Sequence, residues 1–177
     1  MIKSGFRERS LAIIAGTILL AFLAVPGALC QDRGGMGEPG YYNQRGVEYF
    51  KKGFYDHAPK NQAAEAQRNY GFAINEFKAA IAKDPSYTEA HGNLARVYYV
   101  QKNFDGAAEE YKKVTELDPG NLDAYVNLAL ALIELKRPDE AIEALENAKD
   151  QTADPKALNK LDTYIEKVRA HQAGEVR

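Results

Sequence analysis

Cysteine is nearly absent from this chain, which has 177 residues and a single Cys, Cys30. One cysteine excludes an intrachain disulfide, and no C-x-x-C spacing is present to hold zinc or attach a c-type haem. The three histidines, His57, His91 and His171, lie too far apart for the short spacing of a helical metal site. We therefore expect no metal site.

An excess of either charge is missing too, because the formal net charge is −2. Without a basic patch there is no electrostatic footprint for nucleic acid. Apolar residues make up 45% and charged residues 27% of the chain, which is enough for a packed core and argues against global disorder. The length suits one ordinary domain with an extension.

Catalytic motifs are also lacking. The sequence has no G-x-S-x-G, no H-E-x-x-H and no paired cysteine and histidine. Carboxylate pairs occur at Glu109-Glu110 and Asp139-Glu140, at predicted helix starts, where they favour the positive end of the helix dipole. We therefore expect no enzymatic activity, no cofactor and no small-molecule substrate.

The first thirty residues have the order of a secretory signal peptide. Basic residues come first, and an uncharged run follows over residues 11–25. Ala28 and Cys30 then stand three and one positions before Gln31, where signal cleavage requires small residues. Residues 1–30 are thus predicted to be a signal peptide, and residues 31–40 a flexible glycine-rich leader.

Two alternatives for this segment stay open. The uncharged run from Ser10 to Gln31 is just long enough to span a bilayer as an uncleaved anchor. Lipidation of Cys30 is the other alternative, although Leu29 stands where lipoprotein signals carry a small residue. All three interpretations place the folded part outside the cytoplasm, in the periplasm or cell envelope or outside the cell, with membrane attachment only through the N-terminus.

A period of about 34 residues runs through the rest of the chain. It relates His91 to Tyr125, Leu94 to Leu128, Ala95 to Ala129, Tyr98 to Leu132, Ala107 to Ala141 and Tyr111 to Leu145. The order large–x2–Leu–small–x2–large, then Ala–x3–large, then Pro resembles the tetratricopeptide repeat. The resemblance implies an all-α fold, a tetratricopeptide-type α-solenoid built from pairs of antiparallel helices.

The period divides the chain into three helix-pair repeats and a cap. We place the repeats at residues 41–86, 87–120 and 121–154, a C-terminal capping helix at 155–171 and a tail at 172–177. The small residues of the pattern belong where two helices approach most closely, and the large ones form a buried stripe. His91 takes a core position in this register, so we expect a packed histidine rather than a ligand.

The first repeat is longer than the other two. Ala73 precedes Ala107 by one period, whereas Gly46 precedes its counterpart Ala95 by clearly more than one. About fifteen extra residues therefore fall inside the first repeat. One interpretation is a linker over Phe54–Lys60 followed by one long helix from Gln62 to Lys83, rich in strong helix formers, whose extra turns project past the stack. The alternative is a surface loop with a short helix over 59–72, and the sequence does not decide between them.

In the family that this chain resembles, the first helix of each pair lines a concave groove that holds a partner. Those helices are expected near residues 41–52, 87–101 and 122–135. One step round from the core stripe lie the predicted groove residues Asn43, Val47, Phe50, Asn93, Arg96, Tyr99, Val126, Asn127, Leu130 and Ile133. The resemblance implies that an Asn in this region hydrogen-bonds a peptide backbone.

Charge in this stripe is sparse, with Arg96 and Lys51 the basic residues. The set of Lys and Arg that clamps a C-terminal carboxylate in some family members is therefore incomplete. The exposed apolar residues suit an apolar peptide or helix instead. An alternative is that the long second helix or the leader covers the stripe.

These observations predict an exported protein–protein interaction module, an adaptor or scaffold that binds a protein or peptide partner in its groove in the cell envelope. The other hypothesis is a permanent structural subunit of an envelope or surface complex. Both predict a protein or peptide partner and no nucleic acid.

Overall fold

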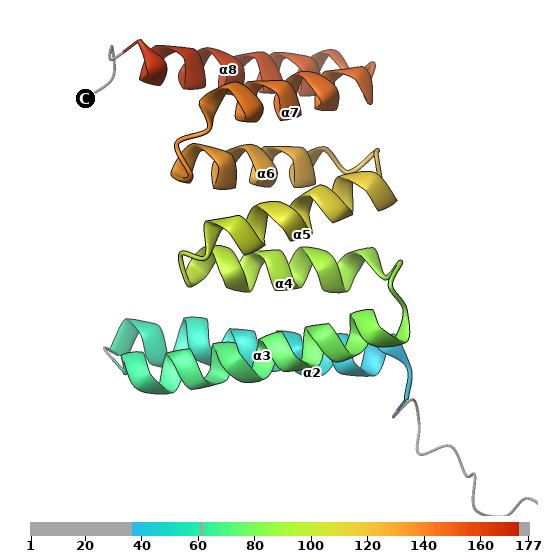
Figure 1. Cartoon of the computed structure of the whole chain (residues 1–177), viewed down its shortest axis with the longest axis vertical. Coiled ribbons are helices and arrows are strands. Elements are labelled where there is room, and N and C mark those ends of the chain that lie inside the picture. Colours follow the sequence, from blue (N-terminus) through green and yellow to red (C-terminus); the bar gives the residue numbers. More distant parts are fainter. Residues whose placement is uncertain (1–36, 61, 174–177) are drawn as a thin grey trace, which may run out of the picture. The chain divides into compact units, whose positions relative to one another are not determined.

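The computed structural model describes residues 37–60 and 62–173, and the regular secondary structure of these residues is helical, without a strand (Figure 1). The predicted signal peptide with Cys30, most of the leader and the end of the tail lie outside the described residues. The helices are α2 (Pro39–Lys51), η1 (Lys52–His57), η2 (Ala58–Lys60), α3 (Ala63–Lys83), α4 (Thr88–Val100), α5 (Phe104–Leu117), α6 (Leu122–Glu134), α7 (Pro138–Asp150) and α8 (Pro155–Gln172).

The predicted all-α fold of helix pairs is confirmed, with each helix packed against the next in chain order (Figure 1). α4 and α6 begin one repeat period apart, as do α5 and α7. Short polar residues start several helices: Asn103 Oδ1 accepts from the Gly106 amide at 3.2 Å, and Asp154 Oδ1 accepts from the Lys156 amide at 3.1 Å. Lys102 and Lys136, equivalent residues of two successive repeats, have φ near 60° and make the tight turn inside a pair.

The predicted core positions are buried except for Tyr98, which is half-buried. Ala95, Ala107, Ala129 and Ala141 are almost inaccessible, as expected where helix backbones approach closely. Gly46 occupies the same place in the first pair, and a Cβ there would lie 2.5 Å from the Phe77 ring. The absence of a side chain at Gly46 is therefore what lets α2 and α3 pack together.

His91 is buried, as predicted, and connects α4 to two neighbours. Its Nδ1 lies 2.6 Å from Glu110 Oε2 on α5. Its Nε2 donates to the carbonyl oxygen of Pro85 at 3.1 Å, because a carbonyl can only accept. The side chain thus holds the turn before α4 and the middle of α5 together, which is a structural role. Glu109-Glu110 lies in the middle of α5, so its predicted place at a helix start is wrong.

The insertion in the first repeat is helical, so the surface-loop alternative is wrong. α3 runs from Ala63 to Lys83 without a break. The predicted linker over Phe54–Lys60 is also wrong, because Lys52–His57 forms a π-helix that continues α2, and Ala58–Lys60 a 3-10 turn. The extra residues therefore lengthen both helices of the first pair, which extends beyond α4 in Figure 1.

Tyr70 explains why the two lengthened helices stay together. This side chain, 3% exposed, packs against η1, where a Cβ on Gly53 would lie 2.8 Å from the Tyr70 ring. Ala66, one turn earlier on α3, is buried as well. Since Gly53 and Ala66 are both small, the aromatic ring of Tyr70 fills the space between the helices, and the extra turns are not left bare.

Candidate functional site

The ten predicted groove residues lie on α2, α4 and α6, the first helices of the three pairs. Their accessibility differs widely. Arg96 and Leu130 are exposed, Asn43 is buried, and the rest are half-buried: Val47, Phe50, Asn93, Tyr99, Val126, Asn127 and Ile133.

Asn43 is a correction to the predicted groove. It is only 4% exposed, and its Oδ1 accepts a hydrogen bond from Asn93 Nδ2 at 3.0 Å. A buried amide needs such a partner, because an unpaired polar group in the core is costly. Asn43 therefore ties α2 to α4 in the core and does not reach the surface, while Asn93 uses one of its donors in the same contact.

A polar hollow of about 430 Å³ lies between α4, α5 and α6. Asn93, Arg96 and Asn127 line it, so the structure brings three of the predicted residues together. Burial raises the pKa of the Tyr111 hydroxyl in this hollow, and Arg96 partly opposes that rise. Three carboxylates complete the charged part of the lining: Glu89, Asp118 and Asp123.

An apolar hollow of about 380 Å³ lies next along α6 and is closed by the cap helix α8. Leu130 and Ile133 come from α6, and Tyr164 and Val168 come from α8. Leu130 is 39% exposed and is the one aliphatic residue among the exposed large hydrophobic side chains of the described residues. The sequence predicted the α6 half of this hollow and missed the α8 half, because α8 was assigned only a covering role.

The other four predicted residues line neither hollow and pack against the two apolar cores. Tyr99 and Val126 contact the core of the later repeats, and Val47 and Phe50 that of the first. The Phe50 ring lies 5.9 Å from the Tyr70 ring of α3, between centroids, and Phe50 is half-buried. Burial, with the nearby Glu134 carboxylate, raises the pKa of the Tyr99 hydroxyl.

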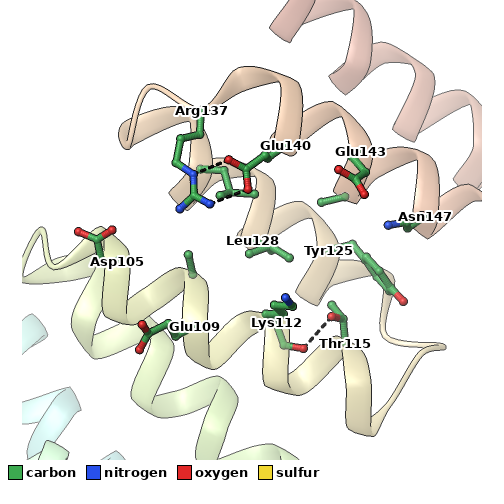
Figure 2. A pocket seen from close by; sticks show the side chains of 13 residues that line it. Asp105, Glu109, Lys112, Thr115, Tyr125, Leu128, Arg137, Glu140, Glu143 and Asn147 are labelled. Carbon is green, nitrogen blue, oxygen red and sulfur yellow. Dashed lines mark hydrogen bonds and ion pairs between the residues drawn. The ribbon is translucent and has the colours of Figure 1, made fainter.

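A third hollow, here the outer hollow, was not predicted. It has about 460 Å³ and lies between the second helices α5 and α7, with Leu128 and Tyr125 of α6 at its floor (Figure 2). The Nε and Nη2 atoms of Arg137 donate hydrogen bonds to the two carboxylate oxygens of Glu140, at 2.6 Å and 2.5 Å. The signal available in the sequence was the spacing of polar residues by three and four positions along each helix, in Asp105, Glu109 and Lys112 and in Glu140, Glu143 and Asn147.

Exposed aromatic side chains gather on the lengthened first pair. Tyr55 is 65% exposed, and Phe54 and Phe72 are also exposed. The Phe54 ring stacks on the Phe50 ring at 5.6 Å between centroids, so these aromatics continue outward from the core of the first repeat. Phe54 and Tyr55 fall in the predicted linker, so the sequence does not place them on a helix face beside Phe72.

Metal and membrane features are not found in the described part of the chain. No three side chains of His, Cys, Asp or Glu converge there to hold a metal ion. None of the helices at 37–60 and 62–173 combines the length and apolar character that a bilayer crossing demands.

Two family models, both described as tetratricopeptide repeat, match residues 62–121 and 101–161. Together they span 62–161, more than half of the chain. The chain belongs to the tetratricopeptide repeat family. A search of the curated proteins finds no match.

Solved structures of tetratricopeptide domains share the fold. The TPR2B domain of yeast Sti1 in its pHsp70 complex is 20% identical, with a TM-score of 0.58, over 75% of this chain and 97% of that one. The first TPR of Spaghetti (RPAP3), bound to the HSP90 peptide SRMEEVD, is 21% identical, with a TM-score of 0.51, over 74% and 95%. TTC0263 of Thermus thermophilus is 18% identical, with a TM-score of 0.59, over 89% and 71%.

Within the tetratricopeptide architecture the three hollows belong to two kinds of surface. The polar and apolar hollows include residues of the first helices of pairs, while the outer hollow is formed mainly by second helices. The polar and apolar hollows share α6, where Asn127 lines one and Leu130 the other. Residues three apart on a helix lie on the same face, so the two hollows are neighbours on one surface.

Proposed function

We propose that this tetratricopeptide protein is a non-catalytic interaction module that binds a segment of a partner protein across the polar and apolar hollows. The observation that carries the proposal is their adjacency on α6, one turn apart at Asn127 and Leu130. Amide and guanidinium groups of the polar hollow suit a peptide backbone, while the apolar hollow suits a large side chain. Such a combination of polar and apolar contacts is what peptide recognition in a helical groove requires.

Proteins of similar fold support a role in binding a protein segment. Two of the similar tetratricopeptide structures are complexes, one with pHsp70 and one with an HSP90 peptide. Repeats that stack side by side create an extended surface, and such proteins generally use it to hold a partner.

We further propose that the protein acts after export, in the cell envelope. The support is the order of the first thirty residues, with a basic start, an uncharged run and small residues before Gln31. The intact mass of the native protein tests it. A mass beginning at Gln31 supports cleavage and a lipid-modified Cys30 supports membrane attachment, whereas recovery of the unprocessed chain contradicts both.

A permanent structural subunit of an envelope complex is the second candidate. The exposed aromatics Phe54, Tyr55 and Phe72 favour it, because they form an apolar surface away from the two hollows. Purification of the native protein distinguishes the two. A stable monomer supports the adaptor, and constant recovery with one fixed partner supports the subunit.

The decisive experiment for the binding role compares capture by wild-type protein and by Leu130→Asp. Affinity capture from envelope extract, quantified by mass spectrometry, should show the partner lost from Leu130→Asp, since truncating an interface anchor costs about 1–4 kcal/mol. Leu130 is exposed, so the melting temperature should change little. Glu109→Lys, on the outer hollow, is the surface control and should capture the partner normally.

Leu94→Ala gives the matching core control. Leu94 is almost inaccessible, so this change should lower the free energy of unfolding by about 2–5 kcal/mol. If Leu130→Asp destabilises the protein as much as Leu94→Ala does, Leu130 serves the core. If Leu130→Asp captures the partner normally, the apolar hollow is not the binding surface.

A further inference from the structure

The apolar hollow is lined by two lysines, and the carboxylate of Asp139 beside it accepts a hydrogen bond from the lining residue Gln172 at 2.9 Å. The nine lining residues of the hollow include Lys136, Lys167 and His171 but no Asp and no Glu. The chain as a whole has 25 acidic and 23 basic residues, so a lining free of carboxylates does not follow from composition. The remaining lining residues are Leu130, Ile133, Pro138, Tyr164, Val168 and Gln172.

The two lysines are available to a partner. Among the described residues, neither Lys136 nor Lys167 forms an ion pair. Lys167 Nζ lies 5.9 Å from the centroid of the Tyr164 ring, which keeps the ammonium group beside the apolar surface. An ammonium group at the edge of an apolar surface is well placed to attract a carboxylate, because screening by water is reduced there.

The outer hollow shows the contrast. Its lining mixes Asp105, Glu109 and Glu143 with Lys112, and its Arg137 is already paired with Glu140. Mixed charge of this kind does not select a partner of either sign. The polar hollow has an acidic balance, with Glu89, Asp118 and Asp123 beside Arg96. Of the three hollows, only the apolar one is lined by lysines without a carboxylate.

We propose that the part of the partner segment over the apolar hollow is acidic: it places one large apolar side chain in that hollow and carboxylates beside Lys136 and Lys167. This inference rests on the proposed function and adds the chemistry of the partner. Apolar contact with Leu130, Ile133 and Tyr164 provides the anchor, and the two lysines orient the segment by charge complementarity. The cap helix α8 then contributes directly to recognition, besides covering the core.

Fluorescence anisotropy with three labelled peptides tests the proposal on the full chain. The acidic apolar probe is GSEDLFEDSG, and the controls are GSKRLFKRSG, with reversed charge, and GSEDSSEDSG, with a polar centre. The acidic apolar probe should bind at least about tenfold more tightly than either control, because each control removes one of the two contributions. Equal or tighter binding of the basic probe overturns the proposal.

Charge reversal at one rim residue gives the second measurement. Lys167→Glu should weaken the acidic probe about tenfold and flatten its salt dependence. Lys156→Glu, an exposed change on the same helix but outside the hollow, should leave binding unchanged within about twofold. The same loss in both variants, or no loss in Lys167→Glu, overturns the assignment to this rim.

Two other occupants of the hollow have their own signatures. If Val176→Ser in the tail raises probe affinity several-fold, the chain's own C-terminus is the occupant and the proposal is overturned. The same holds if the protein forms a dimer that Leu130→Asp abolishes, since the occupant is then a second copy. If partner capture depends on Leu130 but not on the charge of residue 167, the binding role stands and the acidic partner class falls.

Discussion

At the scale of single residues, small side chains decide how closely the helices approach. Gly46, Ala95 and Ala129 hold equivalent places in the three repeats, and all three are buried. The sequence predicts their role, because a small side chain recurs at the same position of each repeat. The pairing of Asn43 with Asn93 was not readable, because it joins residues of two different repeats that no periodic rule relates.

Gly46→Ala tests this close approach. Although alanine favours a helix by about 1 kcal/mol over glycine, its Cβ would lie 2.5 Å from the Phe77 ring, and Phe77 is fully buried. We expect the overpacking to prevail and the free energy of unfolding to fall by about 1–3 kcal/mol in urea titrations.

Gly71→Ala is the matched control on the adjacent helix. Nothing lies within 4 Å of a Cβ placed at Gly71, so only helix propensity acts there. This variant should be more stable than the wild type by about 0.5–1 kcal/mol. Stabilisation by Gly46→Ala of the same size would show that α2 and α3 do not approach as closely as described.

At the scale of helices, the sequence predicted which repeat helices exist and in what order. It predicted the structure of the inserted segment only in part. The repeat period located α4 to α7 because each helix repeats the same apolar spacing. For the insertion, composition identified α3 correctly, since its helix-forming residues act locally. It did not identify η1, in which Gly53 packs against Tyr70, a contact across the pair that composition does not encode.

Hydrogen exchange measures whether the lengthened pair is one unit. Amides of residues 66–69 should be protected together with those of the later part of α3, because their helix is held by Tyr70 against η1. Tyr70→Ala should release protection in both η1 and the start of α3. Phe72→Ala, which removes a side chain that is 46% exposed, should leave it in place.

Fast exchange over 66–69 in the wild-type protein would contradict this account of the insertion. Equal loss of amide protection in Tyr70→Ala and Phe72→Ala would contradict it as well, because the buried ring should matter more than the exposed one.

At the scale of the whole molecule, the candidate site depends on distant parts of the chain coming together. The α6 residues Leu130 and Ile133 were predictable, since an apolar stripe off the core face is visible in one helix. Tyr164, Val168 and the basic rim were not, because they join the site only through the packing of α8 beside the last pair. The outer hollow was missed for the same reason: Asp105 and Glu143 come from helices of different repeats.

The central claim is that the face with the polar and apolar hollows holds a segment of a partner protein, and photo-crosslinking tests it most directly. The full chain carries p-benzoylphenylalanine at position 130, or at position 109 on the outer hollow, or at position 55 on the lengthened first pair. Crosslinked peptides in the native envelope are then identified by mass spectrometry. The account predicts one recurrent partner segment at position 130 and none of it at 109 or 55. Recovery of that segment at 109 or 55, with none at 130, would contradict the account.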